Sequence, residues 1–548
     1  MSDDQPTEPT VPLTPTGEIE TVGPELATPG RRRGAVVAAV AVVVVAVLGG
    51  GAYAAYSFLA GGGPQPADVL PATTVAVVSV DLDPSAGQKI AAIKSIQRFP
   101  ALKKSLGLKA DDDLRQYVFD KVVGAGHCHL DFDKDVKPWL GKRAAFAGVD
   151  LGGAHPAPVI ALQISDPEKA KAGFRAIVGC TDPKDFAYVV GDDYLIASDS
   201  AAHAQSVLDL GRTNPLADDT AYRKWTDEVG DAGVLNFYVS KRAAHYGEQL
   251  LDEFSNGFSE SLLGGTNDNG DQSFADENFA GTDPLASAKD ALKDFDGLAG
   301  TVRFAGGGME LSVAGGGVSQ LSDLATVGKD FGELPADTAV ALGIGIPDDY
   351  AKKTLEQMGS GGDDFVTEAE KQAGLTLPED LQTLLGRSVI ASLGGDAPGS
   401  LDDIKSPDDV PAGVLIHGDA DKIKQIIATA EDHLDMHLSD IPLVVEGSDD
   451  KVAIATSSSY ADDLLKSGGL GSQSRFRDAV PDSDRAAGIL FVDFDSPWGD
   501  TVADMVGSDE SQSAGDEVRH NIAPLRALGF NTWEDGDVSH ALLKITTN

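Results

Sequence analysis

The sequence has few basic residues and none of the short motifs that mark common enzyme sites. It contains no GxSxG elbow, no HExxH pair, no Walker A loop and no GxGxxG after a predicted strand. Lysine and arginine number 43 against 86 aspartate and glutamate residues, a net charge of −43. A surface this negative repels phosphate backbones and anionic lipid headgroups, so nucleic acid is not an expected partner. No cofactor is expected. The missing motifs favour a protein that is not an enzyme, while a triad with distant members stays open.

Charged side chains are also absent from residues 34–60. As a helix, these 27 residues would extend about 40 Å, and a bilayer requires about 20 residues. Arg31, Arg32 and Arg33 precede the segment, and no basic residue follows before Lys89. The positive-inside rule therefore predicts a single-pass protein of the cell membrane, with a cytoplasmic N-terminus and an extracytoplasmic C-terminal region.

The alternative interpretation is a cleaved signal peptide, because the sequence Ala-Tyr-Ala at 52–54 resembles a cleavage site. The preceding 33 residues are acidic overall, unlike a signal peptide, so we favour the retained anchor. Residues 1–33 are rich in Pro, Thr, Glu and Gly and are predicted to be a disordered cytoplasmic tail. Residues 61–67 form a short linker.

Internal similarity is the main feature of the region beyond the linker. LPATT at 70–74 precedes the apolar run VAVVSV, and LPADT at 334–338 precedes AVALGI. Further pairs follow in the same order. LGKR precedes AAFAGVDL, and LGRS precedes VIASL. Each is followed by a strand, an acidic cap and an amphipathic helix, then by two strands around an Asp-rich turn and later by a closing hairpin. Seven matched elements predict two tandem copies of one unit, at residues 68–318 and 332–548.

Each copy is expected to be an α+β unit with a largely antiparallel sheet and helices on one face, because its strands come in adjacent pairs. The copies are expected to lie side by side about a pseudo-two-fold axis, with a groove between them. An apolar lining there would indicate a lipid or another hydrophobic ligand. Residues 255–285, rich in Gly, Asn, Asp and Ser, form an insertion in the first copy that is expected to be flexible. The amphipathic helices place their apolar residues on one face: Ala170, Phe174, Ile177 and Val178 in the first copy, and Ile423, Ile426, Ile427 and Ala430 in the second.

The Arg-flanked apolar segment, the opening LPATTVAVVSVDLDPSAGQKIAAI at 70–93 and the later DVKPWLGKR at 135–143 point to a known family. Together they resemble the actinobacterial membrane-anchored proteins grouped as domain of unknown function 3352. The resemblance covers nearly all of the outer region. It implies an architecture and a location, and it implies no activity or site residues.

Cys128 and Cys180 are the only cysteines, and both are predicted to lie outside the membrane. An oxidising compartment favours a disulfide between them, which would close a loop of about 50 residues and stabilise the fold by roughly 3–4 kcal/mol. Two buried free thiols are the alternative.

Two sequence patterns invite a metal interpretation. His-Cys-His at 127–129 would place both histidines on one face of a strand, but no other ligands follow at a recognisable spacing. Asp131, Asp133 and Asp135 alternate like the start of an EF-hand loop, yet the Gly and Glu required later in that loop are missing, and residues 267–271 fail in the same way. No metal site is predicted, and weak calcium binding by acidic loops stays open.

The sequence thus predicts a membrane-tethered, non-enzymatic module that binds an envelope protein or ligand at the cell surface. One alternative is a signal-relay protein whose threonine-rich tail is phosphorylated in the cytoplasm. Another is a cell-envelope enzyme with an unrecognised site, which a cleft holding a carboxylate and a histidine with perturbed pKa values would support.

Overall fold

In the computed structural model, the described residues are 19–21, 64–81, 130–181, 187–247, 293–305, 308–317, 324–357, 360–396, 404–434, 443–499 and 522–548, with a few single positions between them. The chain divides into two compact units. Unit 1 contains the described residues of 1–31, 63–74 and 115–219, and unit 2 contains those of 75–114 and 220–548. The predicted anchor at 34–60, the insertion at 255–285 and the tail other than residues 19–21 lie outside the described residues. No helix within the described ranges is long and apolar enough to cross a membrane.

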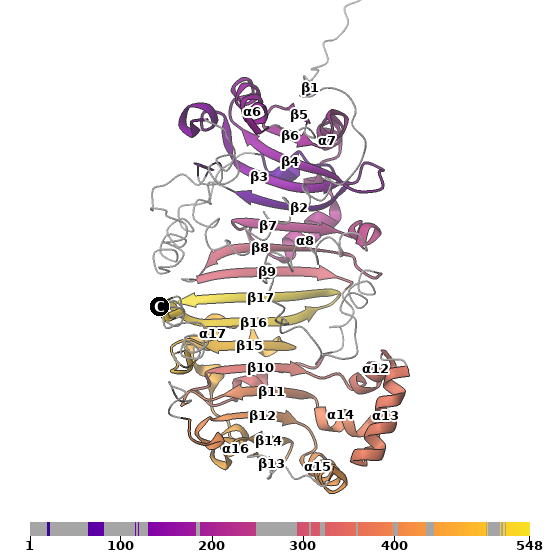
Figure 1. Ribbon diagram of the computed structural model, residues 1–548, viewed down its shortest axis with the longest axis vertical. Helices are drawn as coiled ribbons and strands as arrows, with labels where there is room; N and C mark the ends of the chain where they lie inside the picture. Colours follow the sequence, from indigo (N-terminus) through magenta and orange to yellow (C-terminus); the bar gives the residue numbers. More distant parts are fainter. Residues whose placement is uncertain are drawn as a thin grey trace, which may run out of the picture. The chain divides into compact units, whose positions relative to one another are not determined.

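Unit 1 is built on an antiparallel sheet flanked by helices (Figure 1). The strands lie in the order β3, β4, β6, β5, β1. They are β3 (Leu140–Val149), β4 (Ala157–Ile164), β6 (Tyr194–Ser198), β5 (Ala187–Val190) and β1 (Ile19–Thr21). The helical elements are η2 (Pro66–Asp68), η3 (Phe132–Val136), α6 (Pro167–Thr181), α7 (Ala201–Thr213) and η4 (Leu216–Asp218).

Unit 2 contains a longer antiparallel sheet. Its strands lie in the order β13, β14, β12, β11, β10, β15, β16, β17, β9, β8, β7, β2. They are β2 (Thr74–Asp81), β7 (Leu235–Ser240), β8 (Gly297–Ala305), β9 (Gly308–Gly316), β10 (Val340–Gly345), β11 (Ser388–Leu393), β12 (Ala412–His417), β13 (Val444–Ser448), β14 (Lys451–Ala455), β15 (Gly488–Asp493), β16 (Leu525–Asp535) and β17 (Val538–Thr547). The predicted α+β class with antiparallel pairing is confirmed.

The helices of unit 2 lie between these strands in the sequence. They are α8 (Thr220–Glu228), α11 (Gly328–Gly332), α12 (Tyr350–Gln357), α13 (Ser360–Ala373), α14 (Glu379–Leu385), α15 (Ala420–Leu434), α16 (Ser458–Leu465) and α17 (Ser474–Ala479), with the short turns η6 (Pro407–Asp409), η8 (Leu470–Ser472) and η9 (Ser483–Arg485).

The acidic caps expected before the two amphipathic helices are present. The Asp166 carboxylate accepts a hydrogen bond from the Lys169 amide at 3.1 Å, at the start of α6. The Asp419 carboxylate accepts one from the Lys422 amide at 3.2 Å, at the start of α15. Each cap satisfies a backbone donor that has no partner inside its helix.

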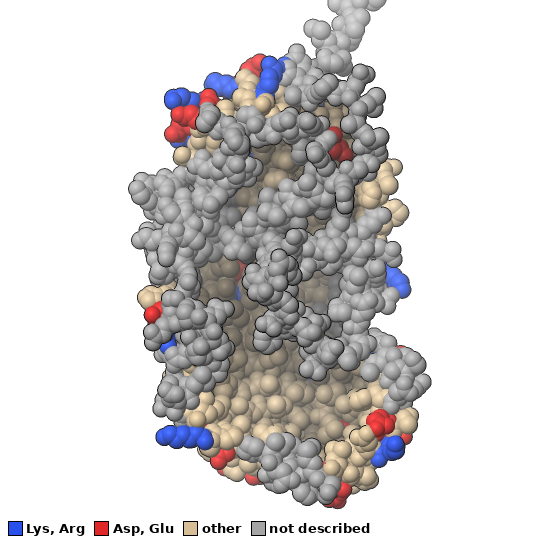
Figure 2. Space-filling model, viewed as in Figure 1, with Lys and Arg blue, Asp and Glu red and all other residues tan. Residues whose placement is uncertain are grey.

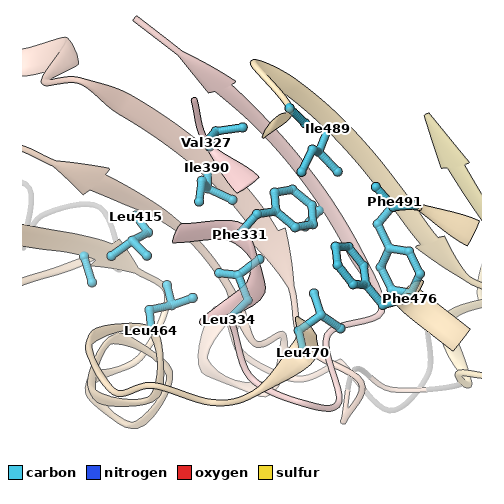
Figure 3. Packing of buried hydrophobic residues seen from close by; sticks show 14 of the residues in the cluster. Val327, Phe331, Leu334, Ile390, Leu415, Leu464, Leu470, Phe476, Ile489 and Phe491 are labelled. Carbon is cyan, nitrogen blue, oxygen red and sulfur yellow. The ribbon is translucent and has the colours of Figure 1, made fainter. Parts of the chain in front are cut away.

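The main core of unit 2 contains three phenylalanine rings that contact one another, in addition to Tyr460 (Figure 3). Phe476 of α17 stacks on Phe331 of α11, with ring centroids 5.7 Å apart, and meets Phe491 of β15 edge to face at 5.3 Å. All three rings are fully buried, among aliphatic residues of β10, β11, β12 and β16. This cluster attaches α11, α16 and α17 to one face of the sheet.

Helices cover both faces of the sheet near β12, so the prediction of helices on one face was wrong. Leu415 joins the main core, whereas its neighbour Ile416 packs with Ile423 and Ile427 of α15 on the opposite face. Successive strand residues point to opposite faces of the sheet. A strand with apolar residues at both odd and even positions is therefore buried on both faces.

A second prediction also needs correction. Residues 140–143 were expected to precede a strand, but β3 already begins at Leu140. The pairing with β4 shifts register between Leu140 and Ala144. An irregularity of this kind adds residues to one strand without ending the ladder.

One pairing pattern occurs twice in the chain. The order β11, β12, β14, β13 in unit 2 matches β3, β4, β6, β5 in unit 1, and the order β10, β15, β16, β17 matches β2, β7, β8, β9. The turns before the first strands also match. Buried Thr74 donates its hydroxyl to the carbonyl of Pro71 at 2.7 Å, and buried Thr338 donates to that of Pro335 at 2.8 Å.

Candidate functional site

The central strands of unit 2 present a second apolar surface, on the side of the sheet opposite the main core. Cross-strand partners share a face, so the registers identify its members. The apolar face is made of Val340, Leu342 and Ile344 of β10, Leu490 and Val492 of β15, Leu528 and Phe530 of β16, Ala541, Leu543 and Ile545 of β17, Met309, Leu311 and Val313 of β9, Leu298, Val302 and Phe304 of β8, and Leu235, Phe237 and Val239 of β7.

Part of the apolar face is open to solvent. Leu342 is 57% exposed and Ile344 is 44% exposed, whereas Leu235, Val302 and Phe304 at the β7–β8 end are buried and the other members are half-buried. Figure 2 views this side of the sheet and shows uncharged residues filling the hollow surface around β10, β11 and β12, with charged residues at its edges. Large exposed aliphatic side chains side by side are uncommon on a soluble surface and mark places where something apolar binds.

Charged residues of β8, β9 and β17 point the other way. Arg303 of β8 pairs with Glu310 of β9 at 2.8 Å, with both side chains more than four-fifths buried, and Lys544 of β17 lies opposite Glu310 in the ladder. These positions alternate with members of the apolar face. These three strands thus place charge on the helix-bearing side, which is the reverse of the usual pattern for a half-exposed sheet. Glu534, near the end of β16, is a charged residue on the side of the apolar face.

The apolar face continues across the boundary between residues 68–318 and 332–548. β9 pairs with β17, and Leu311 stands opposite Leu543. The two stretches are joined here by a continuous strand pair. Sequence reasoning missed the apolar face because alternation shows that a strand has two faces without showing which one is covered.

A carboxylate and a histidine with a perturbed pKa do meet in unit 2. His417 Nδ1 lies 3.1 Å from a carboxylate oxygen of Asp330, and Ser388 donates to the same oxygen at 3.0 Å. Burial lowers the pKa of the His417 imidazole and outweighs the attraction of Asp330. His417 is 1% exposed, and the serine contacts the carboxylate rather than the imidazole. This order differs from a nucleophile–base–acid relay, and a substrate has no access to a buried group, so the cluster fastens α11 to the sheet.

The alternating aspartates form a capped turn. Asp131 accepts from the Lys134 amide at 3.2 Å and from its ammonium at 2.9 Å, which lowers the pKa of the Asp131 carboxyl. Asp133 pairs with Lys137 at 2.6 Å, and Asp135 accepts from the Asp131 amide at 2.8 Å. These carboxylates are thus engaged by lysines and by the backbone of η3. Among the described residues, no group of three or more metal-ligating side chains is found.

Several candidate residues from the sequence fall outside the description. They are Arg31, Arg32, Arg33, Cys128, the side chain of Cys180, the histidines at 127 and 129, and residues 267–271.

The fold and the apolar face define a chain with antiparallel α+β sheets and a broad apolar sheet surface. Residues 37–179 match the model of a family described as a protein of unknown function (DUF3352). This match confirms the predicted family domain for that part of the chain. No curated protein and no solved structure matches the chain.

Proposed function

We propose that the protein is a membrane-tethered, extracytoplasmic binding module that holds hydrocarbon chains of a lipid on the apolar face. The observation that carries this proposal is the row of aliphatic side chains on β10, β15, β16, β17 and β9, open at Leu342 and Ile344. The tether rests on the uncharged segment at 34–60 and the arginines before it. A single span there would place residues 19–21 on the other side of the membrane from unit 1, so in the tethered protein β1 must leave its partner β5.

The chemistry of the apolar face favours a lipid over a protein partner. Protein interfaces derive most of their binding energy from Trp, Tyr and Arg anchors ringed by polar groups. Here the exposed members are leucine and isoleucine, and their half-buried neighbours are mostly aliphatic. The backbone polar groups beneath them are used in the ladder, so the face offers shape and apolar area and few hydrogen bonds.

Overall charge narrows the lipid class. The net charge of −43 disfavours an anionic headgroup near the surface. A lipid with a zwitterionic or neutral headgroup fits both the apolar face and the acidic remainder.

We infer further that residues 68–318 and 332–548 are two copies of one unit. The repeated pairing order supports this, and so does the register of the β9–β17 ladder. Counted from their hairpin turns, Ser312 and Leu542 are equivalent positions, and they stand directly opposite one another. Exchanging the two copies turns each flanking pair of the ladder into another pair of the same ladder. For example, the pair Gly315 and Ser539 becomes the pair Ile545 and Met309. A pseudo-two-fold axis therefore passes between Ser312 and Leu542, and the apolar face straddles it.

The test is photo-crosslinking of the full chain in phosphatidylcholine liposomes that contain a phosphatidylcholine with a diazirine in its acyl chain. Flotation of the liposomes first establishes whether the chain is anchored. The proposal expects crosslinks on peptides from β9, β10 and β15–β17. Crosslinks confined to 34–60 would show an anchored protein without lipid on the apolar face. Capture of a specific envelope protein at Leu342 would replace the lipid by a protein partner.

A further inference from the structure

The apolar face extends onto β11, the strand beside β10. Ala391 lies opposite Leu342, and Val389 lies opposite Ile344. Partners in a ladder share a face, so these two residues of β11 point to the same side as the two of β10. Ala391 is exposed, as Leu342 and Ile344 are. We call these four residues the floor.

Two helices form a wall at one side of the floor. One strand further, Ile416 of β12 lies opposite Val389 and is buried against Leu384 of α14 and Ile427 of α15. The exposed floor therefore ends at β12, where it meets an apolar wall, and Figure 2 shows a hollow there. A hydrocarbon chain in this corner would contact protein on two sides, which removes more apolar area from water than contact with a flat sheet does.

The corner is closed at the end where β10 finishes. Ile346, two residues beyond Ile344, is only 4% exposed. The Gln382 side chain of α14 donates to the Pro347 carbonyl at 2.9 Å and accepts from the Ala351 amide at 3.0 Å. These two bonds tie α14 to the chain that leaves β10, so the floor stops at Ile344.

The opposite end of the corner, where β10 begins and β11 finishes, is acidic. Asp337 precedes β10 and Asp396 follows β11, and both residues are exposed. Their carboxylates attract an ammonium group and repel a second anion. The corner is therefore closed and apolar at one end and charged at the other.

We propose that the corner seats one acyl chain of the bound lipid, with its methyl end at Ile344 and its headgroup beside Asp337 and Asp396. This inference rests on the proposed lipid-binding function and narrows the lipid to one whose headgroup carries an ammonium group. Val340 and Ile344 are four residues apart, so the floor is about 14 Å long. One leaflet of the hydrocarbon core is about 15 Å thick, so an acyl chain matches the floor in length.

Ala391 sets the room in the corner. Its neighbours in the same row across the strands are Leu342 and Val414, which are both larger, so the floor is lowest at the alanine. Ala391→Phe would fill this place with a ring. Because the position is exposed, the substitution should leave the core of unit 2 unchanged.

The experiment places the full chain in phosphatidylcholine liposomes with one of two photo-reactive phosphatidylcholines. The diazirine lies at the methyl end of an acyl chain in the first probe and beside the ester carbonyl in the second. The methyl-end probe is expected to label peptides around Ile344 and α14, and the carbonyl-end probe to label those around Asp337 and Asp396. Ala391→Phe should lower labelling of α14 by about tenfold. The matched control is Ala154→Phe, at an exposed alanine between β3 and β4 of unit 1, which should leave the labelling unchanged.

Each other outcome counts against a different part of the reasoning. Exchange of the two labelling patterns would overturn the orientation of the chain. Labelling confined to β9 and β15–β17 would overturn the inference and leave the proposed lipid site intact, whereas no labelling anywhere on the apolar face would refute the proposed function itself. Equal labelling of α14 in the wild type and in folded Ala391→Phe would also overturn the inference. If that variant does not fold, Ala391→Leu provides the comparison.

Discussion

The apolar face leads to a prediction about two residues. Replacing Leu342 and Ile344 together by serine removes the most exposed aliphatic surface of β10. Fully burying such a side chain is worth about 1.5–3 kcal/mol. A lipid chain covering the exposed 57% of Leu342 and 44% of Ile344 would therefore gain roughly 1.5–3 kcal/mol from the pair. The double variant is expected to bind about 10- to 150-fold more weakly.

The assay is the liposome photo-crosslinking described above, with the mole fraction of diazirine lipid varied to find half-maximal labelling of β10, β15 and β17 peptides. The matched control is Leu210→Ser, because Leu210 is 39% exposed on α7 in unit 1. Both side chains of β10 are already half in solvent, so the free energy of unfolding should change by about 1 kcal/mol or less.

Unchanged labelling in a folded Leu342→Ser/Ile344→Ser variant would refute the assignment of the apolar face as the lipid site. An equal loss in Leu210→Ser would show that labelling reports general hydrophobic contact with the bilayer. Loss in the double variant alone is the predicted result.

Three further predictions concern stability. Phe476→Ala should lower the free energy of unfolding by about 3–5 kcal/mol in urea titrations, because the ring is fully buried between two others, and a loss below 1 kcal/mol would contradict the described packing. The lowered pKa of His417 means that the unfolded chain binds a proton at this residue more readily than the folded chain does, so the free energy of unfolding should fall as the pH drops below the ordinary pKa of 6.5. His417→Gln should flatten this change in the free energy of unfolding between pH 7.5 and 5.5. An unaltered slope in the variant would count against the prediction. A Cys128–Cys180 disulfide predicts that neither thiol is alkylated before reduction, and that Cys128→Ser/Cys180→Ser lowers stability by roughly 3–4 kcal/mol; labelling of both thiols in the unreduced, denatured chain would exclude it.

Local patterns predicted the parts of the fold that local physics determines. Asp166 and Asp419 were identified as caps because a short acidic side chain before an amphipathic helix satisfies free backbone amides. The Asp-rich turn between β13 and β14 was also expected, and Asp449 adopts the positive φ of 51° that such tight turns require.

Features that join distant residues were beyond this reasoning. The Pro64 carbonyl accepts hydrogen bonds from Arg143, Gln163 and Tyr194, which lie 79, 99 and 130 residues away, and no periodicity relates these donors to Pro64. The apolar face depends on the register of strands such as β9, from the middle of the folded region, and β17, from its C-terminal end. The helices on the second face of β12 were missed for a related reason. Apolar residues that point to both faces of a strand do not reveal which element covers each face.

The symmetric register of β9 and β17 bears on how such a protein arises. A strand whose ladder maps onto itself is complementary to a second copy of itself. Under the proposed duplication, a chain with one unit would end in an unpaired edge able to form an isologous homodimer. Joining two units in one chain replaces that encounter by an internal one, at an effective concentration on the order of millimolar. Assembly of the sheet then no longer depends on how many molecules the membrane holds, and each half is free to acquire substitutions that its partner does not share.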